Sequence, residues 1–297
     1  MDTVTHTLFG ATLYAATNKE KMDKPTKRAL LFTCLVGSQI PDIDVVSQFW
    51  DSEGLYQMWH RGITHSLFMV PLWAALLYGI ASLVWRIKDK MIFYMGLLAV
   101  FIHSTSDLFN AWGTGYVEPF SSMRVTFGTI PIIDFVIWFI ILIGFVLSSI
   151  RKIGPISMPR HRIYKWVWAV IVLHVVIQSA QGYVLYQKAA PSYEQHTLAA
   201  SFVPGHFTVI GKNGHTVEIT EGTAWGTLDL RETLHSASET DLDQLFEQNP
   251  AAETLYQWSP FVVVVDNDET LGIYDPRFYQ DGQSFLFEYI DKQRSDP

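Results

Sequence analysis

The stretch LFMVPLWAALLYGIASLVW, residues 67–85, contains no charged side chain. A helix needs about 20 mostly apolar residues to cross the hydrocarbon core of a bilayer. Three further apolar runs, at residues 91–108, 131–150 and 164–186, are of comparable length. A single run of this kind is compatible with a buried core helix, but four runs in one chain predict a helical bundle in a membrane.

Two shorter apolar runs, residues 4–17 and 29–40, precede the four long ones. They are expected either to cross the membrane or to form a short re-entrant pair inside the bundle. The first residues, MDTVTHTL, lack the basic region of a cleavable signal peptide. The chain is therefore expected to insert through its own helices.

The overall composition agrees with a membrane protein. Apolar residues make up 49% of the chain and charged residues 17%, against roughly 25% in soluble domains. These values exclude a disordered chain and argue against a wholly soluble one. The single cysteine, Cys34, excludes a disulfide framework and a cysteine-cluster metal site.

Charge divides the chain into two parts. Residues 1–192 carry a formal charge of +5 and residues 193–297 a charge of −13. An acidic domain of this kind argues against a nucleic-acid partner, because phosphates would be repelled. Most basic residues of the first part fall in three loops between apolar runs, namely Lys19, Lys21, Lys24, Lys27, Arg28, Arg86, Lys88, Lys90, Arg151, Lys152, Arg160, Arg162 and Lys165.

These three loops lie on one side of the membrane if all six apolar segments cross it. The positive-inside rule makes that side cytoplasmic. The N-terminus, residues 41–66, residues 107–130 and the acidic C-terminal part are then extracytoplasmic. The predicted location is a bacterial inner membrane, with several crossings.

The acidic part has the pattern of a small folded domain. Short alternating runs at residues 206–210, 216–219, 261–265 and 285–289 predict strands, and residues 240–247 predict a helix. The predicted fold is thus mostly α, a polytopic helical membrane bundle followed by a soluble α+β domain. We expect the first domain to cover residues 1–190 and the acidic extracytoplasmic domain to cover residues 191–297.

Ionisable side chains are scarce in the apolar part, and those outside the basic loops gather near one predicted membrane face. Such groups at the edge of a bilayer are costly and mark function by default. Imidazole and carboxylate ligands suit zinc, manganese or iron. The candidate metal ligands are His6, Asp44, His60, His65, His103, Asp107 and Asp134.

Taken singly, each of these residues has an ordinary alternative. Asp42 and Asp44 in PDID suit a turn or helix cap, and His60 and His65 suit an interface. His103 and Asp107 are the strongest pair, because a spacing of four places both side chains on one helix face. Their expected coincidence on one membrane face favours a metal site, with zinc as the main candidate, manganese as the alternative, and one to three ions.

A site of this kind predicts hydrolysis of a phosphate ester by metal-activated water. Asp42 or Asp44 is expected to orient the water. Arg61 and Arg124 are expected to hold the phosphate oxygens, although a structural salt bridge suits them almost as well. The position at the membrane surface favours a membrane lipid or another lipid-linked phosphate as substrate.

Four segments, MDTVTHTLFG, PDID, HRGITHS and HSTSDLFNAWGT, resemble the YdjM/YfhP family of membrane-bound metal-dependent hydrolases over roughly residues 1–150. Their order is also distantly similar to zinc-dependent phospholipases C and single-strand zinc nucleases. That likeness implies His6, Asp44, His60, His103 and Asp107 as ligands, with Asp107 bridging. No histidine follows between residues 104 and 160, which departs from the three-metal pattern and favours one or two ions.

The sequence therefore predicts an integral membrane metal-dependent hydrolase of the phosphoesterase or phospholipase C type. The alternative is a metal-containing membrane sensor or regulator without catalysis, whose acidic outer domain binds a partner. A transporter is less favoured, because few polar residues lie deep in the apolar runs.

Overall fold

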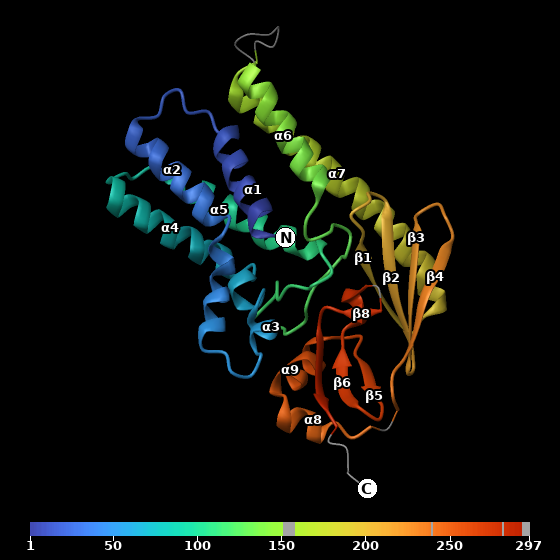
Figure 1. Cartoon of the computed structure of the whole chain (residues 1–297). Helices are drawn as coiled ribbons and strands as arrows, with labels where there is room; N and C mark the ends of the chain where they lie inside the picture. Colours follow the sequence, from blue (N-terminus) through green and yellow to red (C-terminus); the bar gives the residue numbers. More distant parts are fainter. Residues whose placement is uncertain (151–157, 239, 281, 293–297) are drawn as a thin grey trace. The chain divides into compact units, whose positions relative to one another are not determined.

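The computed structural model describes residues 1–150, 158–238, 240–280 and 282–292. It is mostly helical, with β-structure confined to the C-terminal part (Figure 1). The loop residues Arg151 and Lys152, used above to predict orientation, lie outside the described residues. In chain order, the helices of the apolar part are α1 Thr3–Ala16, α2 Lys24–Gly37, the 3-10 segment η1 Ile40–Phe49, α3 Tyr56–Trp59, η2 Ile63–His65, α4 Met69–Trp85, α5 Lys90–Ser106, η3 Asp107–Phe109, α6 Phe135–Ile150 and α7 Arg160–Ala189.

All six apolar runs of the sequence form helices, as predicted. Two of them are long and apolar enough to cross a membrane by themselves, Lys90–Phe109 and Arg160–Ser192. Two bent pairs could add a crossing each, namely α2 with η1 at 55° and the segment Tyr56–His65 with α4 at 73°. Helix α6 is shorter. Within the described residues, two to four crossings are thus supported by length and composition.

The chain separates into two compact units. The first contains residues 1–43 and 61–180, and the second contains residues 44–60 and 181–297. The domains expected from the sequence, residues 1–190 and 191–297, stay a prediction. Helix α7 contributes to both units, because its last turns belong to a different core. Leu185 and Ala189 are fully buried there against the first sheet of the second unit.

The helices of the first unit are joined by apolar contacts of small and large side chains. Buried Ala29, Leu30 and Cys34 of α2 pack with Ile92 and Ala99 of α5. Asp2 caps α1 by accepting hydrogen bonds from the amides of its first turn, and Asp23 does the same for α2. These packed helices hold the ends of α1, α2 and α5 in fixed positions.

One close approach in this unit depends on the absence of a side chain. A Cβ atom on Gly10 of α1 would lie 2.4 Å from Ser38 Oγ and 2.5 Å from the carbonyl oxygen of Cys34. Both contacts are too short for a methyl group, and one of them is to backbone. Gly10 therefore sets the distance between α1 and the end of α2, with His6 one turn earlier on α1.

Replacing Gly10 with alanine is expected to lower the free energy of unfolding by about 1–3 kcal/mol, the usual cost of overpacking. The matched control is Gly79→Ala in α4, where nothing lies within 4 Å of the added methyl group. That change is expected to be neutral or stabilising, because alanine is the better helix former by up to about 1 kcal/mol. Thermal unfolding of the full chain in detergent measures both; equal transition temperatures for the two variants would contradict the prediction.

The second unit is α+β, as predicted. Four antiparallel strands follow one another in the order β1-β2-β3-β4, and three more form the sheet β5-β6-β9. The turn Lys212-Asn213-Gly214 joins β2 to β3, and Gly214 there has a φ of +56°. The elements are η4 Ala190–Ser192, β1 Gln195–Ala200, β2 His206–Asn213, β3 Thr216–Thr223, β4 Leu228–His235, α8 Asp243–Gln248, α9 Pro250–Trp258, β5 Val263–Asp266, β6 Thr270–Tyr274, η5 Pro276–Phe278, β7 Tyr279–Gln280, β8 Gln283–Ser284 and β9 Phe287–Asp291.

The predicted strands correspond to β2, β3, β5 and β9, and the predicted helix to α8. Strand β4 was not predicted, because its sequence LDLRETLH carries charges and most of its side chains are exposed. An edge strand whose side chains are mostly exposed on both faces gives little apolar alternation.

Candidate metal centre

Four side chains of the first unit converge at the ends of its helices. They are Asp42, His65, His103 and Asp107, which each offer one ligand atom within 4.8 Å of all the others. His65, His103 and Asp107 are fully buried, and the Asp42 side chain is 23% exposed. Three separate parts of the chain, η1, η2 and the α5–η3 junction, therefore supply one cluster.

The distances show imidazole nitrogens and carboxylate oxygens directed at one another. His65 Nε2 lies 3.1 Å from His103 Nε2 and 3.2 Å from Asp42 Oδ1. His103 Nε2 lies 3.5 Å from the same Asp42 oxygen. Asp107 Oδ2 completes the group at 3.5 Å from His65 Nε2 and 3.7 Å from His103 Nε2.

The tautomer of His103 is set by a backbone carbonyl. His103 Nδ1 lies 2.7 Å from the oxygen of Ser38, which can only accept a hydrogen bond. In the neutral ring Nδ1 therefore carries the proton and Nε2 presents a lone pair to the cluster. A carbonyl that accepts a hydrogen bond from one ring nitrogen commonly orients the other ring nitrogen of a histidine toward a metal.

The four converging ligand atoms fit a divalent cation. Because carboxylates only accept and His103 Nε2 presents a lone pair, at least three of the four converging atoms are acceptors. Buried acceptors facing one another are unfavourable without a proton or a cation between them. Two imidazoles and two carboxylates are ligands that zinc and manganese use. The only thiol, Cys34, is buried in the helical core.

His6 lies directly beside this group. Its ring stacks on His103 with a centroid separation of 3.7 Å, and its Nε2 is 3.3 Å from Asp107 Oδ1. The side chain is fully buried, and neither ring nitrogen has a hydrogen-bond partner among the described residues. His6 thus borders the cluster through its contacts with His103 and Asp107.

Arg61 contacts Asp107 and is itself buried. Its Nε is 3.5 Å from Asp107 Oδ2, and its Nη1 donates a 2.7 Å hydrogen bond to Asn110 Oδ1. The backbone of Arg61 has a φ of +58°, a left-handed conformation that is costly for a residue with a Cβ. The fold holds this strained residue where its guanidinium balances the buried carboxylate of Asp107.

The remaining candidates are described by the partners that the structure gives them. Asp44 and His60 both belong to the second unit, where Asp44 Oδ1 is 3.1 Å from His60 Nδ1. Asp134 caps α6 by accepting hydrogen bonds from the amides of Val136 and Ile137.

Asp134 also has a histidine partner, because its Oδ2 lies 2.8 Å from His174 Nε2 of α7. Arg124 lies near Glu118, whose pKa is raised by burial and lowered again, less strongly, by the Arg124 charge. Asp134 and Arg124 thus have partners outside the four-residue cluster, and Asp44 pairs with His60.

Several neighbours of the cluster give no sequence signal of their own. Ser38 acts through its backbone carbonyl, which every residue type has. The Thr64 hydroxyl is 3.0 Å from His65 Nδ1 and can orient that ring. The Met1 amino group contacts Asp107, and the Met1 carbonyl accepts a hydrogen bond from Arg61. Only the position of Thr64 beside His65 could have suggested such a role.

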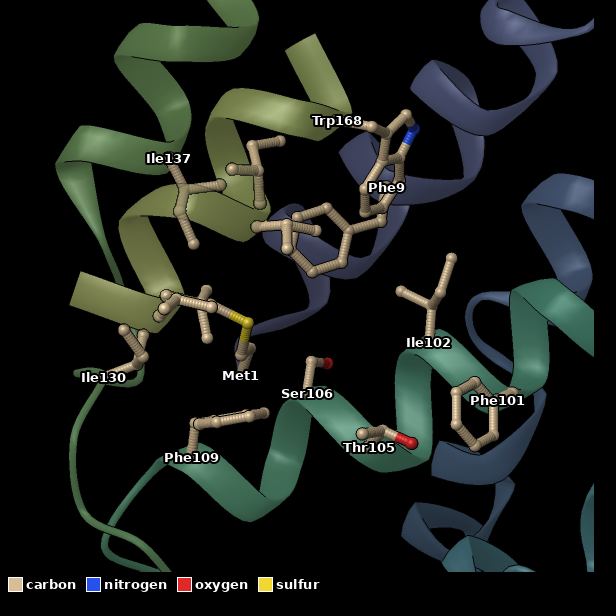
Figure 2. A pocket seen from close by; sticks show the side chains of 14 residues that line it. Met1, Phe9, Phe101, Ile102, Thr105, Ser106, Phe109, Ile130, Ile137 and Trp168 are labelled. Carbon is tan, nitrogen blue, oxygen red and sulfur yellow. The ribbon is translucent and has the colours of Figure 1, made fainter. Parts of the chain in front are cut away.

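An apolar pocket adjoins the cluster within the first unit. Its volume is about 280 Å³, just below the usual range for ligand pockets. Figure 2 shows the Met1 side chain among lining residues such as Phe9, Phe109 and Trp168. The two helices that can cross a membrane unaided, α5 and α7, both line it. Met1 thus touches the pocket with its side chain and the cluster with its backbone.

Comparison with known proteins gives the family. The model of the family described as YdjM inner membrane protein matches residues 1–186. The chain belongs to this family. The matched region includes every residue of the four-residue cluster and ends within α7, so most of the second unit lies beyond it.

One curated relative is the uncharacterized protein YfhP of Bacillus subtilis (strain 168). It is 35% identical to this chain over 138 residues, which cover 45% of this chain and 42% of the relative. The match thus spans less than half of the relative's length. No solved structure matches the chain. The predicted membership of the YdjM/YfhP family is confirmed.

Proposed function

We propose that this protein is an integral membrane, metal-dependent hydrolase that acts on a phosphate ester. The favoured substrate class is a lipid-linked phosphate. The observation that carries the proposal is the convergence of Asp42, His65, His103 and Asp107 on one point. A bound divalent ion, with zinc favoured over manganese, would supply Lewis acidity and a more acidic water at that point.

The chain's own residues have distinct proposed roles. His65, His103 and Asp107 are the buried ligands, and Ser38 holds the His103 ring in the ligand tautomer. Arg61 positions Asp107 and balances its charge. Asp42 is the only partly exposed member of the cluster, which suits a group that orients an incoming water. Arg124 stays a predicted ligand for the phosphate oxygens.

A lipid-linked substrate is favoured by the surroundings of the cluster. The adjoining pocket is apolar and is lined by helices that can cross a bilayer. The family is one of inner membrane proteins. The loop charges favour a site on the extracytoplasmic side, with the acidic domain on the same side and several crossings.

The test is phosphate-ester hydrolysis by the purified full chain. Hydrolysis adds water across a P–O bond, so that hydroxyl goes to phosphorus and a proton goes to the leaving alcohol. Phosphatidylcholine, phosphatidylglycerol and a prenyl phosphate are offered with added zinc or manganese, and released phosphate or phosphorylated headgroup is measured. Wild type is expected to turn over one of them, and His103→Ala/Asp107→Ala is expected to lose that turnover.

The matched control is His174→Ala, which removes a histidine of the same unit that pairs with Asp134 instead. It is expected to keep the activity. Equal release by wild type and the double variant across the lipid panel would contradict the proposal. Chelator-induced unfolding without any turnover would favour the alternative of a non-catalytic metal-containing sensor.

A further inference from the structure

The two ends of the sheet β1-β2-β3-β4 differ sharply in polarity. One end consists of the loop Ser201–Gly205, with the sequence SFVPG, and the loop Thr223–Thr227, with the sequence TAWGT. Neither loop contains a charged residue, in a part of the chain with a formal charge of −13. The opposite end is the turn Lys212–His215, which is polar throughout.

The uncharged end also exposes large apolar side chains. Trp225 is 82% exposed, Phe202 60% and Val203 56%. Three large exposed apolar side chains thus lie at one end of a small sheet. Exposed apolar side chains that gather in one place are typical of an interaction site. We name the two loops with these side chains the apolar tip.

Helix α7 indicates what the apolar tip faces. Trp166 and Tyr186 lie near the two ends of the apolar stretch of this helix, and both are more than one-third exposed. Twenty residues at a rise of about 1.5 Å span about 30 Å, the thickness of the hydrocarbon core. Tryptophan and tyrosine are enriched at the two membrane interfaces. Tyr186, with Tyr183 one turn earlier, therefore marks the level at which α7 leaves the bilayer.

The apolar tip lies at this same level of α7. A Cβ on Gly205 would be 3.0 Å from Gln181 Oε1, and Lys188 Nζ donates a hydrogen bond to the Gly226 carbonyl. The polar end lies further along, because Asn213 Nδ2 donates a 2.9 Å hydrogen bond to the carbonyl of Ser192. Figure 1 shows β1–β4 beside the last turns of α7. The sheet thus packs along the last turns of α7, with its uncharged end near Gln181 and its polar end near Ser192.

We propose that the apolar tip inserts into the interface of the same bilayer that α7 crosses. Trp225 and Phe202 would sit at the level of the lipid headgroups, with Val203 directed into the acyl boundary. The absence of charge in both loops suits this position, since a carboxylate there would be desolvated. Each buried apolar side chain stabilises the attachment in proportion to the area removed from water.

The experiment places a fluorescent label on single cysteines of the full chain. Cys34 is replaced by serine, and the label is attached at Trp225→Cys, at Val203→Cys, or at His215→Cys as the control on the polar end of the same sheet. The proteins are reconstituted into vesicles of phosphatidylcholine and phosphatidylglycerol. Quenching is measured with headgroup-nitroxide phosphatidylcholine and, separately, with aqueous iodide.

Labels at 225 and 203 are expected to be quenched several-fold more by the nitroxide lipid than the label at 215, and several-fold less by iodide. Equal iodide quenching at all three sites, without lipid quenching, would overturn the proposal. Shielding from iodide without lipid quenching would also overturn it, because protein rather than lipid would then cover the tip. Two probe sites guard against misfolding of one variant.

Discussion

Purified His103→Ala protein is expected to bind divalent metal more than about tenfold more weakly than wild type. Even the loss of a residue that only orients a ligand costs about 10–100-fold in metal affinity. His103 is fully buried, and its Nε2 faces Asp42, His65 and Asp107. Alanine at this position removes one of the two imidazole ligands of the four-residue cluster. Elemental analysis after dialysis, with chelator competition to rank affinities, measures the change.

The control for this prediction is again a histidine of the same unit. His174 Nε2 pairs with Asp134 at 2.8 Å, and the pair is separate from the four-residue cluster. His174→Ala is expected to bind metal as wild type does. Metal loss in His174→Ala, or equal metal in wild type and His103→Ala, would show that the cluster is not the binding site.

The second large effect is expected in the second unit, at a buried ion pair. Arg277 Nη2 lies 2.6 Å from Asp275 Oδ2, and Arg277 Nε is 3.0 Å from the same oxygen. Both side chains are almost completely buried, and the guanidinium stacks 4.6 Å over the ring of Trp258. Asp275→Ala removes the carboxylate that pairs with this buried cation and is expected to destabilise the unit by about 3–5 kcal/mol.

Urea-dependent pulse proteolysis of the full chain measures this loss through cleavage within residues 181–297. The control is Glu221→Gln, which breaks the exposed pair that Glu221 forms with Arg231 at 3.0 Å. An exposed pair contributes at most about 1 kcal/mol, since solvent screens it. A similar urea midpoint for both variants would mean that burial does not set the strength of the Asp275–Arg277 pair.

Much of the helical part could be predicted from the sequence, because uncharged runs such as residues 67–85 leave few alternatives to a helix. The number of crossings could not. The bends between α2 and η1 and before α4 depend on how neighbouring helices pack, and composition does not encode them. The division at residue 180 was hidden for a related reason, because α7 is one continuous helix whose last turns pack on a sheet.

The candidate site shows the same limit. The spacing of His103 and Asp107 places both on one helix face, and the structure brings them together with His65. Sequence could not decide between Asp42 and Asp44, because two carboxylates two residues apart in one short segment are equally suited to hold an ion or to cap a turn. Asp134 begins an apolar run, where a helix cap and a metal ligand look the same.

The wide spacing of the cluster along the chain has a consequence for folding order. Asp42, His65 and His103 come from three segments separated by long stretches of sequence. An ion held by them would link three distant segments in the folded state only, because the unfolded chain does not hold these ligands together, and binding would stabilise the folded state by mass action. The ion would add no contact between the segments themselves. Helix α5 would be linked to the N-terminal helices through the ion, and this link could form only after all three segments have been synthesised.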